Sequence, residues 1–508
     1  MTGQAADLLR AGGGGGTLKT PFPTIAIFRP MSEPLPNAAQ LSPVRNKLLW
    51  LVSLGFFMQT LDGTIVNTAL PAMARDMGES PLHMHSVIVA YSLAMAVLIP
   101  ASGWLADRFG TRRVFMSAIA LFVLGSVLCA LSPRLDFLVA SRVVQGLGGA
   151  LLLPVGRLAV LRAFPREQFI RAISFVAIPG LVGPLIGPTL GGWMVEFASW
   201  HWIFWVNVPV GLIGLAAASR YMPTGEQMPA RGFDLAGYVM LAAGMALVSL
   251  AVESMARGGV RSASALIMMV FGLACLCGYW LHALKKTEPL FAPELFSVRT
   301  LRVGLLGNLF SRLGSSAMPF MTPLVLQVSL GYSPMNAGMM MLPTVIGSML
   351  TKPLVTRVIH RLGYRQVLMT NTWVLALLIA SFSFIAPGIP VPLLIAQLGI
   401  FGAVNSLQFS AMNTVTLKDL MPDFASSGNS LLSMVQMLAM GMGVAAAGAV
   451  LAAFQANFDA ASPGATLWAF RATFIVMGLL TLAATLLFMQ LPTRELPRMS
   501  TAGPEQHN

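Results

Sequence analysis

Long apolar runs separated by short polar breaks occupy most of the chain. Each run has about twenty residues, the length that an α-helix needs to cross a bilayer. The runs are continuous rather than alternating, so they indicate helices and not the strands of a membrane barrel. We therefore expect an all-α polytopic membrane protein with fourteen spans, at approximately 48–70, 86–106, 113–132, 136–158, 172–195, 202–220, 235–253, 263–284, 303–325, 336–356, 366–386, 391–414, 429–453 and 470–490.

The overall composition agrees with this pattern. The chain is 56% hydrophobic and 10% charged, whereas charged residues make up about 25% of soluble domains. Its net charge of +13 does not indicate nucleic-acid binding, because the cations lie in short loops between spans. Cys129, Cys275 and Cys277 lie inside apolar runs, and their spacing favours packing over a disulfide or a metal site. We expect the lipid bilayer as a partner, and neither nucleic acid, metal nor cofactor.

The distribution of lysine and arginine predicts the orientation in the membrane. If the N-terminus is cytoplasmic, the opposite side receives only Arg75, Arg134, Arg257, Arg261 and Arg471. This asymmetry satisfies the positive-inside rule, so we expect both termini in the cytoplasm. The predicted divisions are a disordered tail (1–44, with Met31 as an alternative start), a six-helix bundle (45–222), a linker with two extra spans (223–299), a second six-helix bundle (300–491) and a tail (492–508).

The first span carries an acid, Asp62. A carboxylate inside a membrane span costs about 2.5–3.5 kcal/mol on insertion scales. Gly55, Gln59, Asp62 and Val66 share one helix face by their spacing, and this face is small and polar, so we expect it to face the bundle interior. Asp62 is then either a proton carrier or cation anchor, or one member of a static pair.

Arg142 is the expected partner of Asp62. The predicted spans place Asp62 roughly 12 Å and Arg142 roughly 9 Å from the same membrane side, at 1.5 Å per residue, and charges within membranes usually pair. We hypothesise that the two residues pair and that movement of this pair changes the proton affinity of Asp62 between two access states.

Arg312 lies near the middle of the ninth span. Three interpretations remain open: it pairs with an acid, for example Asp62 across a cavity; it contacts an anionic or zwitterionic substrate; or it has another structural role. Neutral polar residues at similar depth could contact substrate or a neighbouring helix; these are Gln59, Asn67, Gln145, Asn207, Asn308, Asn405 and Gln408. His83 and His85 are expected to be solvated in an outer loop.

Two stretches after the second and tenth spans are alike, GWLADRFGTRR (103–113) and PLVTRVIHRLGYR (353–365). Each has a glycine and a basic cluster at a cytoplasmic turn, and such repeated halves are typical of secondary transporters. In the first stretch, Asp107 is expected to bind nearby arginines or a helix N-terminus. It would thereby hold the bundles in one state; the alternative is a topology signal made by the cations alone.

The fifth span carries glycines at four-residue steps, Gly183, Gly187 and Gly191. Such a strip permits close helix contact, and we expect Pro184 and Pro188 to kink the helix. The strip is either a tight contact between the bundles that limits proton leak or simple helix packing.

Several of these motifs resemble those of a known family. Gly103, Leu105, Asp107, Arg108, Gly110, Arg112 and Arg113 match the signature of the major facilitator superfamily. Four more stretches resemble its drug:proton antiporter branch with fourteen helices, of the EmrB/QacA type and nearest to HsrA-like members. They are LDGTIVNTALP (61–71), RVVQGLGGA (142–150), GLVGPLIGPTLGG (180–192) and WHWIFWVNVPVG (200–211), the last with His201 where arginine is usual.

This resemblance implies a fold of two six-helix bundles with a two-helix central insert. It implies proton-coupled export of amphipathic small molecules or drugs from a bacterial inner membrane, with Asp62 and Arg142 in proton coupling. It also implies a conformational latch at Gly103, Asp107, Arg108, Gly110, Arg112 and Arg113, and an antiporter motif at Gly180, Gly183, Pro184, Gly187, Pro188, Gly191 and Gly192.

Other functions remain as alternatives. A proton-coupled symporter or facilitator for a metabolite would have the same architecture, as would a transport-silent membrane sensor. An enzyme is not expected, because the sequence shows no nucleophile–base constellation and no phosphate loop. The expected partners are protons and a small-molecule substrate, with a periplasmic adaptor protein as a further candidate.

Overall fold

The computed structural model describes residues 43–223, 232–258, 263–421, 424–457 and 464–492. Every regular element in these ranges is a helix, so the chain is an all-α polytopic protein. The first part of the chain forms α1 (Pro43–Asp76), α2 (His85–Leu98), η2 (Ile99–Ala101), α3 (Ser102–Phe109), α4 (Thr111–Ala130), α5 (Leu135–Ala163), α6 (Arg166–Phe197), α7 (Trp202–Trp205) and α8 (Asn207–Tyr221).

The rest of the chain continues the same pattern. Its elements are α9 (Leu235–Gly258), α10 (Ala263–Ala283), η3 (Pro293–Ser297), α11 (Arg299–Ser315), α12 (Met318–Val328), α13 (Pro334–Met339), α14 (Leu342–Ser381), η4 (Phe382–Phe384), α15 (Val391–Leu417), α16 (Ala425–Asn457) and α17 (Ala465–Phe488). The predicted tails, 1–44 and 492–508, fall almost entirely outside the described residues.

Twelve helical stretches among the described residues are long and apolar enough to cross a membrane. This number differs from the fourteen predicted at two places. The stretch Pro334–Phe384 has 51 residues, far more than the ~20 that one span needs, and Gly363 interrupts it with non-helical backbone angles. The predicted ninth span is divided between α11 and α12, of 17 and 11 residues. The count of fourteen therefore remains a prediction.

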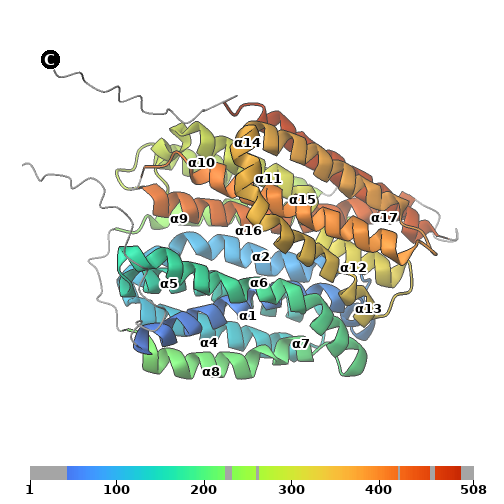
Figure 1. The fold of residues 1–508 in the computed structure, drawn as a ribbon, viewed down its shortest axis with the longest axis horizontal. Helices are drawn as coiled ribbons and strands as arrows, with labels where there is room; N and C mark the ends of the chain where they lie inside the picture. The colour runs from blue at the N-terminus through green and yellow to red at the C-terminus, as the bar shows by residue number, and fades with distance from the viewer. Residues whose placement is uncertain (1–42, 224–231, 259–262, 422–423, 458–463, 493–508) are drawn as a thin grey trace, which may run out of the picture. The chain divides into compact units, whose positions relative to one another are not determined.

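The helices form two groups with a helix pair beside them. In Figure 1, α1 to α8 (blue to green) lie in the lower part and α11 and α14 to α17 (yellow to red) in the upper part, and α2 and α16 meet between them. At the right, α12 and α13 reach down to α1 and α6. The pair α9 and α10 pack on each other, and α9 also packs on α16 and α2. The described residues from Pro43 onward form one compact unit, so the predicted divisions within it remain predictions.

The two similar sequence stretches adopt the same backbone turn. Gly110, between α3 and α4, has φ 85° and ψ 142°, and Gly363, inside α14, has φ 76° and ψ 157°. Side chains other than glycine rarely occupy positive φ at such ψ. The repeat predicted from sequence is therefore also a structural repeat.

The insert is anchored at the start of α9 by Asp234. Its carboxylate accepts the N–H of Gly237 at 3.1 Å and contacts Nε2 of His282 on α10 at 2.8 Å. Burial alone raises the pKa of Asp234, but its bonds to His282 and Gly237 lower that pKa below its ordinary value. The contact thus joins α9 and α10 through an ionised acid.

The glycine strip of α6 packs against α1, within the first group of helices. A Cβ on Gly183 would lie 2.4 Å from Oγ1 of Thr60, and one on Gly191 would lie 2.5 Å from the carbonyl oxygen of Ile65. The strip is therefore mainly a contact inside one half, and the expected role as a contact between the bundles is wrong for most of it. The helix runs without interruption from Arg166 to Phe197 although Pro184 and Pro188 lie inside it.

The two halves touch at the end that contains the C-terminus of α6 and the N-terminus of α13. A Cβ on Gly192 would lie 2.3 Å from the carbonyl oxygen of Pro334, and one on Gly338 would lie 2.2 Å from that of Pro188. The N–H of Met335 donates to Glu196 at 3.0 Å. A large buried apolar cluster around Leu70 and Met321 covers the same region. Backbones come this close only because glycine has no side chain.

We predict that Gly338→Ala separates α6 from α13. The added methyl group cannot fit against backbone atoms of Pro188, and such overpacking typically costs about 1–3 kcal/mol. Thermal unfolding of the purified protein in detergent should show a lower midpoint for this variant. Gly214→Ala is the matched control, since its Cβ would approach no atom closer than 3.7 Å. Equal midpoints for the two variants would contradict the close contact.

Candidate functional site

Asp62 lies completely buried inside the first group of helices. Its side chain, on α1, is 0% exposed and is surrounded by residues of α5 and α8. The expectation that this acid faces a bundle interior is confirmed. However, the interior is that of the first half alone, sealed from solvent in this state.

Three side chains donate hydrogen bonds to the Asp62 carboxylate. Nη1 of Arg142 lies 2.6 Å from Oδ2, Nε2 of Gln145 lies 2.8 Å from Oδ1, and Nδ2 of Asn207 lies 3.0 Å from Oδ1. The predicted ion pair between Asp62 and Arg142 is therefore present. The three donors hold the carboxylate in one position, since hydrogen bonds to a charged group are stronger than those between neutral groups.

Arg142 also contacts α2. Its Nε donates to the carbonyl oxygen of Val87 at 3.3 Å, and its guanidinium carbon lies 4.1 Å from the centre of the Tyr91 ring. A further bond joins Nη1 of Arg142 to Oε1 of Gln145 at 2.5 Å. The arginine, at 1% exposure, thus connects the acid on α1 to the backbone and an aromatic ring of α2.

Gln145 extends the network to α4. Its Nε2 donates to Oγ of Ser126 at 2.8 Å, and Sγ of Cys129 lies 3.7 Å from its Oε1. Gln145 was a candidate for substrate contact, but its amide bonds only groups of this buried network. The site therefore combines side chains of α1, α2, α4, α5 and α8 around one negative charge.

Some members of this network were not predicted as site residues. Tyr91 and Ser126 are ordinary residues in their spans, and Asn207 was considered only as one of several neutral polar groups. Only the similar depth of Asn207 and Asp62 in the membrane could have indicated from the sequence that these two side chains meet. No sequence pattern indicates that Tyr91 stacks on Arg142.

The polar candidates of the second half form a separate, uncharged network. Nε2 of Gln408 donates to Oγ1 of Thr372 at 2.8 Å, and Nδ2 of Asn371 donates to Oε1 of Gln408 at 2.8 Å. Asn308 bonds the carbonyl of Gly304 in its own helix at 3.0 Å. Gln408 and Asn308 are therefore occupied by protein partners.

The remaining polar candidates differ in exposure. Gln59 and Asn405 are partly exposed, whereas Asn67 is 6% exposed. Gln59 is one helical turn before Gly63, where an added Cβ would meet no atom within 4 Å. This face of α1 therefore borders open space. Gln59 and Asn405 keep their predicted role as substrate contacts, which the structure does not test.

Arg312 is not brought to Asp62. The Asp62 carboxylate binds Arg142, Gln145 and Asn207, whereas Arg312 stacks on the ring of Phe409 at 4.6 Å. The interpretation in which Arg312 neutralises Asp62 is therefore wrong for this state.

The predicted latch residues make contacts within the first half. Asp107 forms an ion pair with Arg162 at the end of α5, and Arg112 donates to the carbonyl oxygen of Ser219 on α8. Arg108 and Arg113 are exposed. The Asp107 contact thus fastens α3 to α5, and it does not join the two bundles as the latch hypothesis expected. Gly103 has open space beside it.

His85 is buried, which corrects the expectation of a solvated loop residue. It is the first residue of α2, is 1% exposed, and its Nε2 lies 2.9 Å from Oε2 of Glu253 on α9. A Cβ on Gly448 of α16 would lie 2.8 Å from the His85 ring. His83, in contrast, has a side chain that is 47% exposed. Nothing in the segment around His85 predicts that α9 packs over the start of α2.

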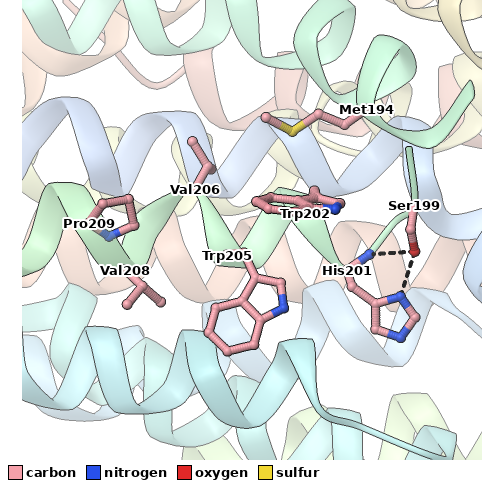
Figure 2. A pocket seen from close by; sticks show the side chains of 8 residues that line it. All are labelled: Met194, Ser199, His201, Trp202, Trp205, Val206, Val208 and Pro209. Atoms are coloured by element: carbon pink, nitrogen blue, oxygen red, sulfur yellow. Dashed lines mark hydrogen bonds between the residues drawn. The ribbon is translucent and has the colours of Figure 1, made fainter. Parts of the chain in front are cut away.

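An apolar groove of about 800 Å³ lies outside the buried site. Figure 2 shows its lining by Met194, Trp202, Trp205 and neighbouring side chains, with Ser199 bonded to His201 at one end. Tryptophans of this kind are typical of the membrane interface. The groove contains none of the predicted site residues, and its lining suits hydrocarbon chains.

Comparison with known proteins settles the family. The sequence model described as Major Facilitator Superfamily matches residues 52–444 and residues 304–507. The chain belongs to the Major Facilitator Superfamily. This membership agrees with two repeated halves and with the signature stretch that ends at the Gly110 turn.

Curated superfamily members are similar along most of the chain. A protein of Serratia proteamaculans (strain 568) named multidrug resistance protein MdtD is 51% identical over 444 residues, 87% of this chain and 93% of that protein. A protein of the same name from Escherichia coli O9:H4 (strain HS) is 48% identical over 444 residues, 87% of this chain and 94% of its own.

Solved structures show the same superfamily fold. A POT family transporter in complex with 5-aminolevulinic acid aligns with a TM-score of 0.63 at 15% identity. The alignment covers 88% of this chain and 95% of the transporter chain. The human organic anion transporter MFSD10 aligns with a TM-score of 0.57 at 15% identity, over 88% of this chain and 100% of its own. Identities this low concern the fold alone.

We predict that Arg142→Met destabilises the protein more than the double variant Asp62→Asn, Arg142→Met. Removing one partner of a buried pair leaves an uncompensated charge, which typically costs roughly 3–5 kcal/mol, whereas neutralising both partners costs much less. Thermal unfolding in detergent at pH 8 measures the two effects. Equal losses in the single and double variants would show that Asp62 is not the charge that Arg142 compensates.

Proposed function

We propose that the chain is a proton-coupled exporter of amphipathic small molecules in a bacterial inner membrane, with both termini in the cytoplasm. The names of its relatives support efflux, and the lysine and arginine distribution supports the orientation. The observation that carries the proposal is the buried Asp62–Arg142 pair, because Arg142 bonds at the same time to the helix that contacts the other half.

Protonation of Asp62 is the proposed coupling step. Loss of the negative charge removes the counter-ion of Arg142 and weakens three charge-assisted hydrogen bonds at once. Arg142 then sits in an apolar interior without compensation, which is unfavourable unless it moves. Its bond to Val87 and its contact with Tyr91 transmit that movement to α2.

Helix α2 transmits the movement of Arg142 to the second half of the protein, α11 to α17. Gly441 of α16 packs against Ser92 of α2, where an added Cβ would lie 3.4 Å from the serine Cβ, and Gly448 packs on His85. A displacement of α2 therefore changes the contact between the halves. Because Asp62 is sealed in this state, proton and substrate compete through this conformational change and not by direct contact with one carboxylate.

The state of the protein follows from where the halves touch. The contacts of Gly192, Glu196 and Gly338, and the bond from Gln327 to the carbonyl of Thr68 at 3.0 Å, lie at one end of the helices. In the proposed orientation this end is periplasmic, so the structure represents a state closed toward the periplasm. The inward proton gradient supplies the energy of the transport cycle, since one charge crossing 100 mV releases about 2.3 kcal/mol.

We predict that Asp62→Asn abolishes proton-coupled transport. The amide keeps the shape of the acid but cannot exchange a proton, so substrate addition should no longer release protons. Proteoliposomes with an imposed pH gradient, a fluorescent amphiphile and a lumenal pH dye measure both fluxes. Asp136→Asn is the matched control, because Asp136 is an exposed acid in the first turn of α5 and should retain wild-type coupling.

Two other outcomes would decide against the proposal. Proton and amphiphile moving in the same direction would indicate symport. Unchanged coupling in Asp62→Asn would show that the proton uses another group.

A further inference from the structure

Arg312 lies deep in the second half without a counter-ion. It follows the start of α11 by thirteen residues, about 20 Å at 1.5 Å per residue. Its side chain is partly exposed, and its guanidinium contacts the Phe409 ring at 4.6 Å. Within the ranges that the structure describes, this guanidinium has no ion pair, and its Nε is buried without a hydrogen-bond acceptor.

Two other arginines that lie within helices are compensated by partners. Arg142 has Asp62 as its counter-ion, and Arg471 donates from Nε and Nη2 to the carbonyl oxygen of Ile385 at 3.1 and 2.9 Å. A charged side chain at this depth is unfavourable in lipid and normally faces a partner or a water-filled path. Arg312, which is partly exposed and has no ion pair among the described residues, therefore presents its guanidinium donors to the accessible space beside it.

Among the described residues, no acid of the membrane interior is available to bind a cationic substrate. Asp62 is the only acid of the described residues that lies more than one turn from the end of a candidate span. It is 0% exposed and already accepts three hydrogen bonds. Arg157, on α5, is a second partly exposed cation without an ion pair in the described part of the chain. The uncompensated charge of the interior is thus positive.

The neighbours of Arg312 complete a site for an amphiphile. Phe409 is 38% exposed and supplies an aromatic surface, and Asn405 lies one turn before it on α15. Behind Arg312, a Cβ on Gly443 of α16 would lie 3.0 Å from its carbonyl oxygen. Since α16 also packs on α2, a ligand at Arg312 is two helix contacts away from the Asp62 network.

We infer that Arg312 binds the acidic group of the transported molecule, so that the cargo is an anionic or zwitterionic amphiphile carrying a carboxylate or sulfonate. The inference rests on the proposed export function and names its substrate class. A guanidinium fork matches a carboxylate in two parallel hydrogen bonds, and the Phe409 ring covers the adjoining apolar part of the molecule. Arg312 is thus the residue that selects the charge of the cargo.

The test compares two dyes of similar shape, rhodamine B with a free carboxylate and rhodamine 6G with an ester in its place. Fluorescence anisotropy with the purified full-length protein in detergent gives both dissociation constants without a proton gradient. Wild type should bind rhodamine B at least about tenfold more tightly, as expected for one charge-assisted pair. Arg312→Gln should lose this preference and keep its affinity for rhodamine 6G, whereas Arg302→Gln, an exposed arginine of the same helix, should behave as wild type.

Three results would overturn the inference: wild-type preference for rhodamine 6G, equal binding of the two dyes by wild type, or an unchanged preference in Arg312→Gln. If Arg312→Gln does not fold, Arg312→Lys keeps the charge without the planar fork and should reduce the preference for rhodamine B. Dye binding is measured without a gradient, so it tests the substrate class alone. The proposed export function would fail in a different experiment, by the absence of any gradient-driven flux.

Discussion

The structure depends on the compensation of one buried negative charge. The carboxylate of Asp62 lies where no water reaches it, so protein groups must supply every interaction that water would have made. Arg142 contributes the opposite charge, and Gln145 and Asn207 contribute amide donors. These residues come from three helices, so the arrangement of α1, α5 and α8 is tied to the ionisation of one group.

Because the arrangement of these helices depends on the ionisation of Asp62, the first half can act as a switch. A network that is fully satisfied with the acid ionised becomes unsatisfied when the acid is neutral, and each orphaned donor is then costly. Elsewhere the same half is packed rigidly: the glycines of α6 bring its backbone against α1, and Asp107 fastens α3 to α5. The movement that follows neutralisation of Asp62 is therefore directed to α2, which contacts α16 of the second half. In the second half, the network around Gln408 is uncharged and provides no comparable switch.

Much of this could be predicted from the sequence, and the limits have a physical cause. Hydrophobic run lengths give the number of residues per span and hence the depth of each polar group, which is why the pairing of Asp62 with Arg142 could be predicted. Depth and helix face do not specify which helix is the neighbour. The glycine strip was therefore predicted as a close contact, while its partner, in the same bundle or in the other, stayed open until the structure placed most of it against α1. His85 was placed in solvent because nothing in its own segment indicates that Glu253 packs over it. Tyr91 could not be found for the same reason.

The central claim is that the charge of Asp62 controls the contact between the halves. The most direct measurement is the distance between spin labels at Leu131 and Phe384, by electron–electron double resonance in lipid nanodiscs. Leu131, directly after α4, is 61% exposed, and Phe384, the last residue of η4, is 81% exposed. Cys275 and Cys277 are replaced by serine, and Cys129 is buried and stays. Asp62→Asn at pH 8 should change the distance distribution, because a neutral residue 62 removes the counter-ion of Arg142 and thereby alters the contact of α2 with α16. The same distribution with and without the substitution would contradict the account.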